Sequence, residues 1–387
     1  MISERLPPHA EPNTLTRRLD ALRAAGETYV DLTQSNPTRV GIPYPADLLT
    51  PLGDAVALHY DPHPFGLASA RAAVAADCAR RGVHVDPAAI VLTASTSEAY
   101  TWLFKLLCNP GEGVLVPRPS YPLFEHLTRL EGVRAEPYEL EYHGRWEVDF
   151  ASIERAPADT RALLLVTPNN PTGSFVSERE IDRMSAICRD RGWALVADEV
   201  FADYLLEAAA PVRDLASRAG ACLTFTLGGC SKALGLPQVK LGWIVAGGPP
   251  ELRATALAGL EMVADSFLSV GTPVQVAAPA LLRRGAAIRA AIQARIATNL
   301  ASLRTAAASF PSSEVLRVEG GWSAVIRVPA THGEEELVLD LLERERILAH
   351  PGYFFDFRQE AYIIVSLLPL RDVFDAAIPR LLRAVCR

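Results

Sequence analysis

Lys232 is the residue of this sequence best suited to covalent chemistry. The β-rich run Leu223–Leu227 ends at two glycines, and Ser231 and Lys232 follow in a segment of small and apolar residues. Burial beside apolar neighbours disfavours the charged form of a lysine and lowers its pKa. The neutral amine is a nucleophile that can form a Schiff base with a carbonyl compound. Spacing alone leaves a surface lysine after a strand as an equal alternative.

Asp198 is the second candidate, because it directly follows the short apolar run Ala194–Ala197. A carboxylate at the end of a buried strand is costly unless a cation faces it. A protonated pyridine nitrogen on a cofactor would be such a cation, and the carboxylate would keep the ring able to accept electrons. A helix cap or a salt bridge in the core would also account for Asp198.

Two polar loops contain further groups for binding a cofactor. Over Thr93–Glu98 a strand ends and a helix begins, and free N–H groups at such a start suit a phosphate. The hydroxyl side chains in this loop are those of Ser95, Thr96 and Ser97. The same residues would also serve as an ordinary helix cap. The second loop, Pro168–Gly173, is a turn by composition, and the amide of Asn170 could donate to a phenolate oxygen on a cofactor ring.

Helices alternate with short apolar strands from residue 54 onward, and these elements must position the candidate groups. Such alternation predicts βαβ units, a mostly parallel sheet and helices on both faces. Ligands of open α/β sheets bind beyond the carboxyl ends of the strands, where the candidate groups are found. The expected strands are 90–93, 114–117, 134–138, 162–167, 194–197, 223–227 and 243–246. The expected helices are 68–81, 98–107, 122–130, 178–191, 250–264, 274–283 and 286–309.

The two ends of the chain have a different pattern. A helix capped by Asn13 and ending before Gly26 is expected first, followed by a strand over 29–33. The tail combines strands over 323–327 and 362–366 with helices over 334–344 and from Arg371. Because 387 residues exceed the usual size of one core, two domains are expected. The fold class is α/β, with a large doubly wound domain (50–283) and a smaller α+β domain (1–49 with 284–387).

The composition is that of a globular enzyme, with 49% hydrophobic and 21% charged residues. A net charge of −7 with both signs interspersed argues against a nucleic-acid partner. The six cysteines are scattered without a C-x-x-C pair, so neither a metal site nor a disulfide framework is expected. With no apolar run of about 18 residues and no apolar leader segment, a cytoplasmic protein without a membrane partner is expected.

The spaced set of Asn-Pro-Thr-Gly at Asn170, Asp-Glu at Asp198 and Ser-Lys at Lys232 resembles the class I/II aminotransferases, which are fold type I pyridoxal-phosphate enzymes. The resemblance extends from Asp31 to the final helix. It implies that Lys232 holds pyridoxal 5'-phosphate as a Schiff base and moves protons at the substrate Cα. It also implies that Asp198 pairs with the pyridine nitrogen and that Asn170 bonds the ring 3-oxygen.

The same resemblance implies roles for other residues. Tyr121 would stack on the cofactor ring, and Tyr60 would reach the phosphate of a neighbouring subunit. The phosphate-binding residues would be Ser95, Thr96, Ser97, Ser231 and Lys240. Members of the family are homodimers with a shared active site, and their small-molecule partners are an amino substrate and a keto acid acceptor.

Three departures from the family pattern concern the cofactor. Phe201 stands where the family has a tyrosine that bonds the ring oxygen, so the pKa of the Schiff base is expected to rise. The sequence leaves open whether the nearby Tyr204 supplies this hydroxyl instead. Lys240 replaces the usual phosphate-binding arginine and keeps the charge without the bidentate fork. Gly229 replaces a hydroxyl donor.

A fourth departure concerns the substrate. Ile364 occupies the position of the arginine that clamps the α-carboxylate in the family, and isoleucine cannot form that bidentate pair. Either another arginine (Arg358, Arg39 or Arg371) takes this role, or the substrate lacks a carboxylate there. Ser35, where the family often has glycine, also indicates an altered pocket. Ser35 and Arg358 are the substrate-binding candidates.

Three functions follow from these residues. The favoured one is a pyridoxal-phosphate-dependent aminotransferase acting on an amino acid or a related amine through Lys232. The alternative is another reaction on the same fold (a C–S or β-lyase, a cyclase or a decarboxylase), because the carboxylate clamp decides which Cα bond breaks. A non-catalytic cofactor-binding protein is disfavoured, since Lys232, Asp198 and Asn170 are all retained.

Overall fold

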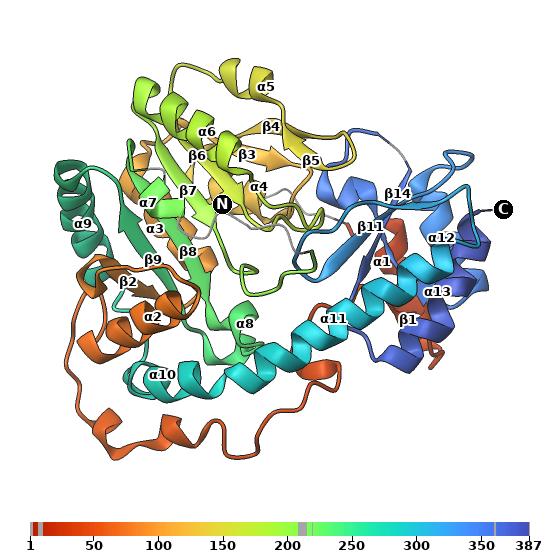
Figure 1. Ribbon diagram of the computed structural model, residues 1–387, viewed down its shortest axis with the longest axis horizontal. Helices are drawn as coiled ribbons and strands as arrows, with labels where there is room; N and C mark the ends of the chain where they lie inside the picture. The colour runs from red at the N-terminus through yellow and green to blue at the C-terminus, as the bar shows by residue number, and fades with distance from the viewer. Residues whose placement is uncertain (1–2, 7–10, 208–214, 219, 360, 387) are drawn as a thin grey trace.

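The computed structural model of the protein describes residues 3–6, 11–207, 215–218, 220–359 and 361–386. Within these residues the centre is an eight-stranded sheet of order β2-β9-β8-β7-β6-β3-β4-β5 (Figure 1). The bounds are β2 Ile90–Thr93, β3 Gly113–Arg118, β4 Arg134–Tyr142, β5 Trp146–Val148, β6 Thr160–Val166, β7 Ala194–Asp198, β8 Thr224–Gly229 and β9 Gly242–Gly247. From β8 to β4 the neighbours are parallel, whereas β9 and β5 pair antiparallel. The expected mostly parallel sheet is confirmed.

Helices cover both faces of this sheet. One face packs against α3 (Thr96–Leu107), α4 (Leu123–Glu131) and α9 (Pro250–Asp265). The other face packs against α2 (Ala68–Arg80), α5 (Phe150–Glu154), α6 (Glu178–Arg191), α7 (Leu215–Arg218) and α10 (Thr272–Arg284). Side chains alternate between these two cores along each strand, as period-two geometry requires. The arrangement is the doubly wound one that the sequence predicts.

Residues 139–159 are more regular than the sequence pattern indicates. The fourth strand continues beyond Tyr138 to Tyr142 and pairs back on β5 as an antiparallel hairpin. The turn contains Gly144 at a φ of 83°, a conformation that favours glycine. The prediction ends the strand too early because Glu139 and Glu141 interrupt its apolar character, as is common where a strand lies near the edge of a sheet.

The C-terminal part forms a second sheet, of order β10-β11-β14-β13, with antiparallel neighbours. Its strands are β10 Glu314–Val315, β11 Ser323–Arg327, β13 His350–Pro351 and β14 Tyr362–Ser366, and β1 (Val30–Asp31) pairs in parallel with β12 (Ile347–Leu348). Helices α1 (Thr14–Ala24), α12 (Glu334–Arg344) and α13 (Arg371–Val385) belong to this part. The 22-residue helix α11 (Ala286–Ala307) extends from α10 to α13 (Figure 1).

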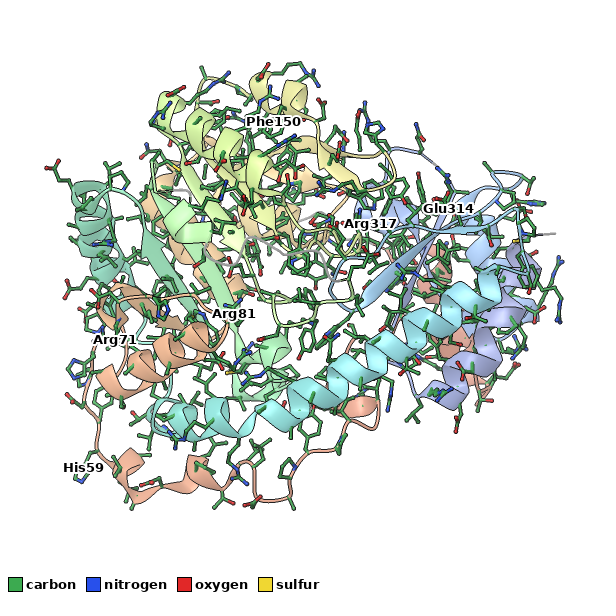
Figure 2. All side chains as sticks on the ribbon, viewed as in Figure 1. His59, Arg71, Arg81, Phe150, Glu314 and Arg317 are labelled. Carbon is green, nitrogen blue, oxygen red and sulfur yellow. The ribbon has the colours of Figure 1, made fainter. Side chains whose placement is uncertain are left out.

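The chain between β1 and α2 is an extended segment along the outer edge of the molecule, below the large sheet in Figure 1. It contains the short 3-10 helices η1 (Pro37–Arg39), η2 (Thr50–Gly53) and η3 (Ala55–Leu58). Figure 2 shows His59 at its outer border. No helix in the part of the chain that the structure describes is long and apolar enough to span a membrane.

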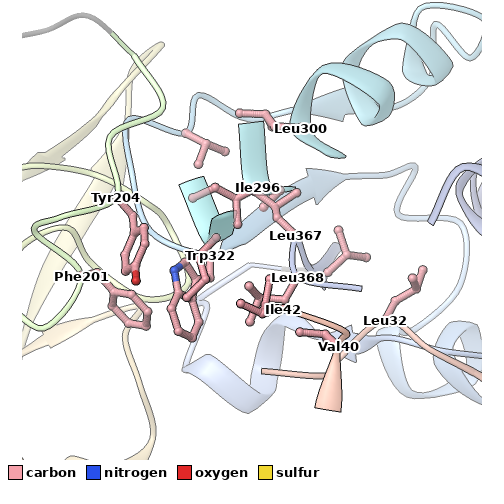
Figure 3. Packing of buried hydrophobic residues seen from close by; sticks show 14 of the residues in the cluster. Leu32, Val40, Ile42, Phe201, Tyr204, Ile296, Leu300, Trp322, Leu367 and Leu368 are labelled. Carbon is pink, nitrogen blue, oxygen red and sulfur yellow. The ribbon is translucent and has the colours of Figure 1, made fainter. Parts of the chain in front are cut away.

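One apolar core joins the N-terminal segment, α11 and the chain after β14. Figure 3 shows Leu32 and Ile42, Ile296 of α11, and Leu367 packed in this core. At its border Trp322 faces Phe201 and Tyr204, which follow strand β7 of the large sheet. The segment before β11 is thereby held against the loop after β7.

Candidate active site

The predicted site residues come together at one edge of the large sheet. Strands β2, β8, β7, β6 and β3 run in one direction, and the loops at their C-terminal ends contain the candidate groups. Ser95, Thr96 and Ser97 follow β2, Ser231 and Lys232 follow β8, Asp198 ends β7, Asn170 follows β6 and Tyr121 follows β3. Lys240 precedes β9, which runs the opposite way and so begins at the same edge. This edge is where ligands of such sheets bind.

Lys232 lies on the one-turn helix α8 (Cys230–Ala233) directly after β8. Burial lowers its pKa, while the nearby Asp198 carboxylate acts in the opposite direction. Its nitrogen is 5.6 Å from the centroid of the Phe201 ring and 5.3 Å from that of the Trp322 ring. The amine is therefore in the apolar setting that favours a neutral nucleophile.

Asp198 is buried at the end of β7, and its carboxylate has two donors. Oδ2 accepts from the Tyr100 hydroxyl at 3.1 Å, and Oδ1 accepts from the Val200 N–H at 3.0 Å. Burial raises the pKa of Asp198 to about 6, although both hydrogen bonds and the charge of Lys232 favour the ionised form. A further cation would stabilise this carboxylate, which fits the N–H of a protonated pyridine ring.

Tyr100 is a site residue that the sequence does not reveal. It lies on the buried side of α3, one helical turn after the polar loop Ser95–Ser97. The available signal is the tyrosine itself, because a buried hydroxyl needs a hydrogen-bond partner. Nothing local indicates that this partner is Asp198.

Asn170 is oriented by contacts from two directions. The Ser323 hydroxyl donates to its Oδ1 at 3.3 Å, which leaves the amide N–H groups available to a ligand. The adjacent Asn169 side chain donates to Pro119 O and to Thr172 Oγ1, each at 2.9 Å. Asn169 thus ties the Asn170 loop to the loop that contains Tyr121.

The phosphate candidates surround the start of α3. Ser95 Oγ accepts from the Glu98 N–H at 3.1 Å and caps the helix. A Cβ added to Gly242 would lie 3.0 Å from Ser95 C and 3.2 Å from Thr96 N. Gly242 therefore lets the start of β9 approach the helix start closely, and the helix start with its hydroxyl side chains forms a cradle suited to an anion.

Gly242→Ala is expected to weaken binding of the phosphate-bearing cofactor about tenfold, which corresponds to about 1.4 kcal/mol. The added methyl group must displace the backbone of Ser95 and Thr96, and overpacking of this kind typically costs about 1–3 kcal/mol. A titration of the apoprotein with pyridoxal phosphate measures the effect. Gly53→Ala is the control, because its Cβ meets no atom within 4 Å; equal affinity of Gly242→Ala and wild type would contradict the cradle.

Tyr204 does not take the place of the tyrosine that Phe201 replaces. Its hydroxyl donates to Lys232 O at 2.8 Å and to Ala233 O at 3.2 Å. The ring is fully buried, and burial raises its pKa. Tyr204 therefore holds the backbone of α8, and through it the position of Lys232.

Ion pairs with arginines of α11 and of α2 and its C-terminal end hold the loop after Asp198 in place. Arg80 of α2 pairs with both Asp77 and Asp203, and Arg289 of α11 also pairs with Asp77 at 3.1 Å. Arg81 pairs with the carboxylate of Glu199 at 3.5 Å. Since buried ion pairs are costly to break, this network makes the loop a rigid support.

Three candidate residues lie farther out on the described surface. Tyr121 is 48% exposed and Tyr60 is 71% exposed. Tyr60, on the extended segment, lines a small hollow with Gly66 and with Gln275 of α10, and Lys232, Asp198 and Asn170 do not line it. Ser35 is also exposed, in the loop whose Gln34 carbonyl accepts from the Ser366 hydroxyl at the end of β14.

The arginine candidates differ in their surroundings. Arg358 Nε is 3.9 Å from Glu139 Oε1, a carboxylate that also pairs with Arg118. Arg371 pairs with Asp375 at 3.2 Å on α13, and Arg39 is exposed on η1. Ile364 is buried among apolar side chains, which are those of Trp146, Leu316, Val325, Phe355 and Tyr362. The place of the usual carboxylate clamp is therefore apolar.

The chain resembles known proteins along nearly its whole length. The family "Aminotransferase class I and II" matches residues 45–367. Glutamate-pyruvate aminotransferase of Haemophilus influenzae is 27% identical over 371 residues, covering 94% of this chain and 92% of that protein. Alanine aminotransferase of Mycobacterium bovis is 29% identical over 371 residues, covering 93% and 86%.

Solved structures share the fold. An aminotransferase from Escherichia coli superposes with a TM-score of 0.88 at 24% identity, covering 100% of this chain and 99% of that one. Alanine aminotransferase from Pyrococcus furiosus gives 0.87 at 21% identity, covering 99% of both. Together with the buried lysine and carboxylate at the strand ends, these similarities place the chain in the class I and II aminotransferases, and it is a pyridoxal-phosphate-dependent aminotransferase.

Proposed function

We propose that Lys232 and Asp198 are the two principal cofactor-binding residues of the active site. The observation that supports this is that a desolvated amine and a desolvated carboxylate stand at the ends of neighbouring parallel strands. Pyridoxal phosphate bound between them supplies an electron sink for the bonds at the substrate Cα. Lys232 would hold the cofactor through its amine and, once the substrate amine has displaced it, would accept and return the proton at the substrate Cα. Asp198 would hold a proton on the pyridine nitrogen.

Other residues bind and orient the cofactor in this proposal. Asn170, fixed by Ser323, donates to the ring oxygen. Tyr121 covers the ring, and its exposure leaves it free to do so. The phosphate is bound by residues around the start of α3, which are Ser95, Thr96, Ser97, Ser231 and Lys240. Their hydroxyl and ammonium groups and the free N–H groups of the helix start suit an anion.

We propose that the substrate carboxylate is bound by Arg358. This arginine lines a pocket of about 500 Å³ together with Arg327, Glu139, Tyr142, Trp146 and Tyr362. Trp146 and Tyr362 also pack around Ile364, so the pocket adjoins the apolar place of the usual clamp. Because alanine and glutamate-pyruvate aminotransferases are among the relatives, alanine, glutamate and pyruvate are the first substrates to test. Ser35, in the loop whose Gln34 carbonyl contacts the end of β14, would border the same substrate.

Arg358→Ala is expected to raise KM for the amino acid about 10–100-fold with a smaller change in kcat. A hydrogen bond to a charged group contributes about 1.5–3 kcal/mol, and Arg358 would bind the carboxylate in both ground and transition states. Steady-state kinetics measure the effect. Arg371→Ala is the matched control, an exposed arginine paired with one carboxylate. A rise in KM for Arg371→Ala but not for Arg358→Ala would assign binding of the substrate carboxylate to Arg371 instead.

A lyase is the second candidate, and Ile364 favours it, because loss of the clamp changes which Cα bond the site aligns. S-alkyl-thiohydroximate lyase of Arabidopsis thaliana is 29% identical over 223 residues, covering 57% of this chain and 48% of that protein. A panel of amino acids offered to the holoenzyme separates the two reactions. Formation of pyridoxamine phosphate with a keto acid supports transamination. Release of ammonia and a keto acid without pyridoxamine phosphate would favour the lyase.

We also propose a cytoplasmic homodimer in which each chain is divided into a large domain, 50–283, and a small domain, 1–49 with 284–387. Exposed apolar side chains gather on the extended segment, at Val56, Leu58 and Tyr60. Figure 2 labels His59 of this segment. Other exposed apolar side chains follow in and after α9, at Met262 and Phe267. Exposed apolar surface of this kind is typical of an interface, and Tyr60 would cross it to a partner's phosphate. Light scattering of the holoenzyme tests the dimer, which the mass of a single chain would refute.

A further inference from the structure

The Lys232 amino group faces two adjoining aromatic rings, which both lie on one side of it. Its nitrogen is 5.3 Å from the Trp322 centroid and 5.6 Å from the Phe201 centroid, within the range at which a ring face attracts a cation. The two rings meet edge to face, with centroids 5.3 Å apart and planes at 71°. Trp322 is only 3% exposed, so its ring is shielded from solvent.

The surroundings hold both rings in place. Trp322 packs edge to face on Tyr204, with centroids 5.2 Å apart, and Tyr204 donates to the Lys232 carbonyl. Figure 3 shows Trp322 with Phe201 and Tyr204 on one side and the core residues Leu367 and Leu368 on the other. The indole N–H has no hydrogen-bond acceptor among the residues that the structure describes. What Trp322 offers Lys232 is thus an aromatic ring at a defined place.

We propose that the adjoining ring faces of Trp322 and Phe201, here called the aromatic clamp, position the Lys232 amino group and stabilise positive charge on its nitrogen. The inference rests on the proposed role of Lys232 and adds a residue to it. Phe201 has no hydroxyl to donate to the cofactor, but it keeps a ring face toward the lysine. Trp322 supplies the second face, and tryptophan is the side chain that attracts a cation most strongly. Trp322 acts through Lys232 and is a positioning residue.

The direction in which Trp322→Leu shifts the pKa of Lys232 distinguishes stabilisation of the cation from simple exclusion of water. Burial lowers the pKa of Lys232. If the Trp322 ring acted only by excluding water, Trp322→Leu would loosen the site and raise that pKa. If the ring stabilises the cation, the same substitution lowers it, by about one unit or tenfold in the protonation equilibrium. The two explanations therefore predict opposite shifts.

The apoprotein gives the first measurement. The chain contains three lysines, Lys105, Lys232 and Lys240, so acetic anhydride labelling against pH can follow each one by peptide mass. We expect Trp322→Leu to lower the pKa of Lys232 by about one unit and to leave Lys105 and Lys240 unchanged. Trp322→Phe keeps a ring and breaks no hydrogen bond, so it should show less than half of that shift. An unchanged or raised pKa of Lys232 in Trp322→Leu would overturn the clamp.

The holoenzyme gives an independent measurement, the pH at which its visible absorption band changes. This pH should fall by a similar amount in Trp322→Leu. Trp102→Leu is the control, because Trp102 is a buried tryptophan of α3 whose N–H also lacks an acceptor in the described chain, and it packs on Phe267. An equal shift in Trp102→Leu would mean a general loss of packing and would overturn the clamp. If wild type formed no visible band, the cofactor assignment would fail, and the labelling experiment would still decide the clamp.

Discussion

Asp198→Asn is expected to stabilise the protein without its cofactor while it removes most of the activity. Burial raises the pKa of Asp198 from 3.8 to about 6. The folded chain therefore binds this proton more tightly than the unfolded chain, and its free energy of unfolding falls as pH rises from about 4 to about 6. Above that window the penalty is fully present, at about 3 kcal/mol for a shift of about two units.

The substitution removes this pH dependence, because an amide does not ionise. At pH 7 the apoprotein of Asp198→Asn should be more stable than wild type by up to about 3 kcal/mol, and the difference should vanish below about pH 4. Denaturant unfolding at several pH values measures it. Asp86→Asn is the control, an exposed helix cap where asparagine serves as well as aspartate. A parallel pH profile for wild type and Asp198→Asn would show that Asp198 is not the titrating group.

The activity of Asp198→Asn should fall about 10²–10⁴-fold. Loss of one partner of a buried charge pair costs about 3–5 kcal/mol, and the neutral amide cannot hold a proton on the pyridine nitrogen. Single-turnover kinetics at saturating cofactor separate this loss from weaker binding. Activity within threefold of wild type would refute the proposed pairing. Functional sites typically contain residues that destabilise the apoprotein and are nevertheless needed for the reaction.

Lys232→Ala is expected to abolish the covalent link to the cofactor and to lower the rate at least about 10²–10⁴-fold. That range is the usual contribution of a positioned acid or base, and the Schiff base is lost in addition. Borohydride reduction of the holoenzyme followed by peptide mass measurement locates the link, and with three lysines in the chain the result is unambiguous.

Lys105→Ala is the matched control, since Lys105 pairs with Glu131 on α3 and α4 and should affect neither property. Lys240→Ala should keep the covalent link but bind the cofactor more weakly, because an exposed cation near the phosphate is lost. A reduced label on Lys105 or Lys240 in the wild-type protein would contradict the assignment of Lys232.

Most of the large sheet follows from local patterns. Strands such as Ile90–Thr93 and helices such as Glu178–Arg191 begin and end where the sequence predicts. Short apolar runs that alternate with helical segments are local features of the sequence, so they can be recognised without the fold. The hairpin after Tyr138 was missed, since its charged residues resemble a loop until their neighbours are known.

The groups at the strand ends can be read from the sequence: Lys232, Asp198, Asn170 and the hydroxyls of Ser95–Ser97. Parallel strands bring their carboxyl ends to one edge, so this much follows from topology. The hydrogen-bond partners of these groups cannot be read from the sequence. Tyr100 and Asp198 are 98 residues apart, and Ser323 and Asn170 are 153 apart.

The position of Trp322 beside Lys232 likewise depends on the fold, because an aromatic residue before a strand is as often part of the core as part of a site. The direction of the Tyr204 hydroxyl could not be read from the sequence either. In the structure this hydroxyl donates to the Lys232 carbonyl, so Tyr204 does not replace the hydroxyl that Phe201 lacks. The physical reason is the same in each case. A buried polar or aromatic group is satisfied by whatever the fold places within about 3–6 Å, and the sequence order of the chain does not encode that distance.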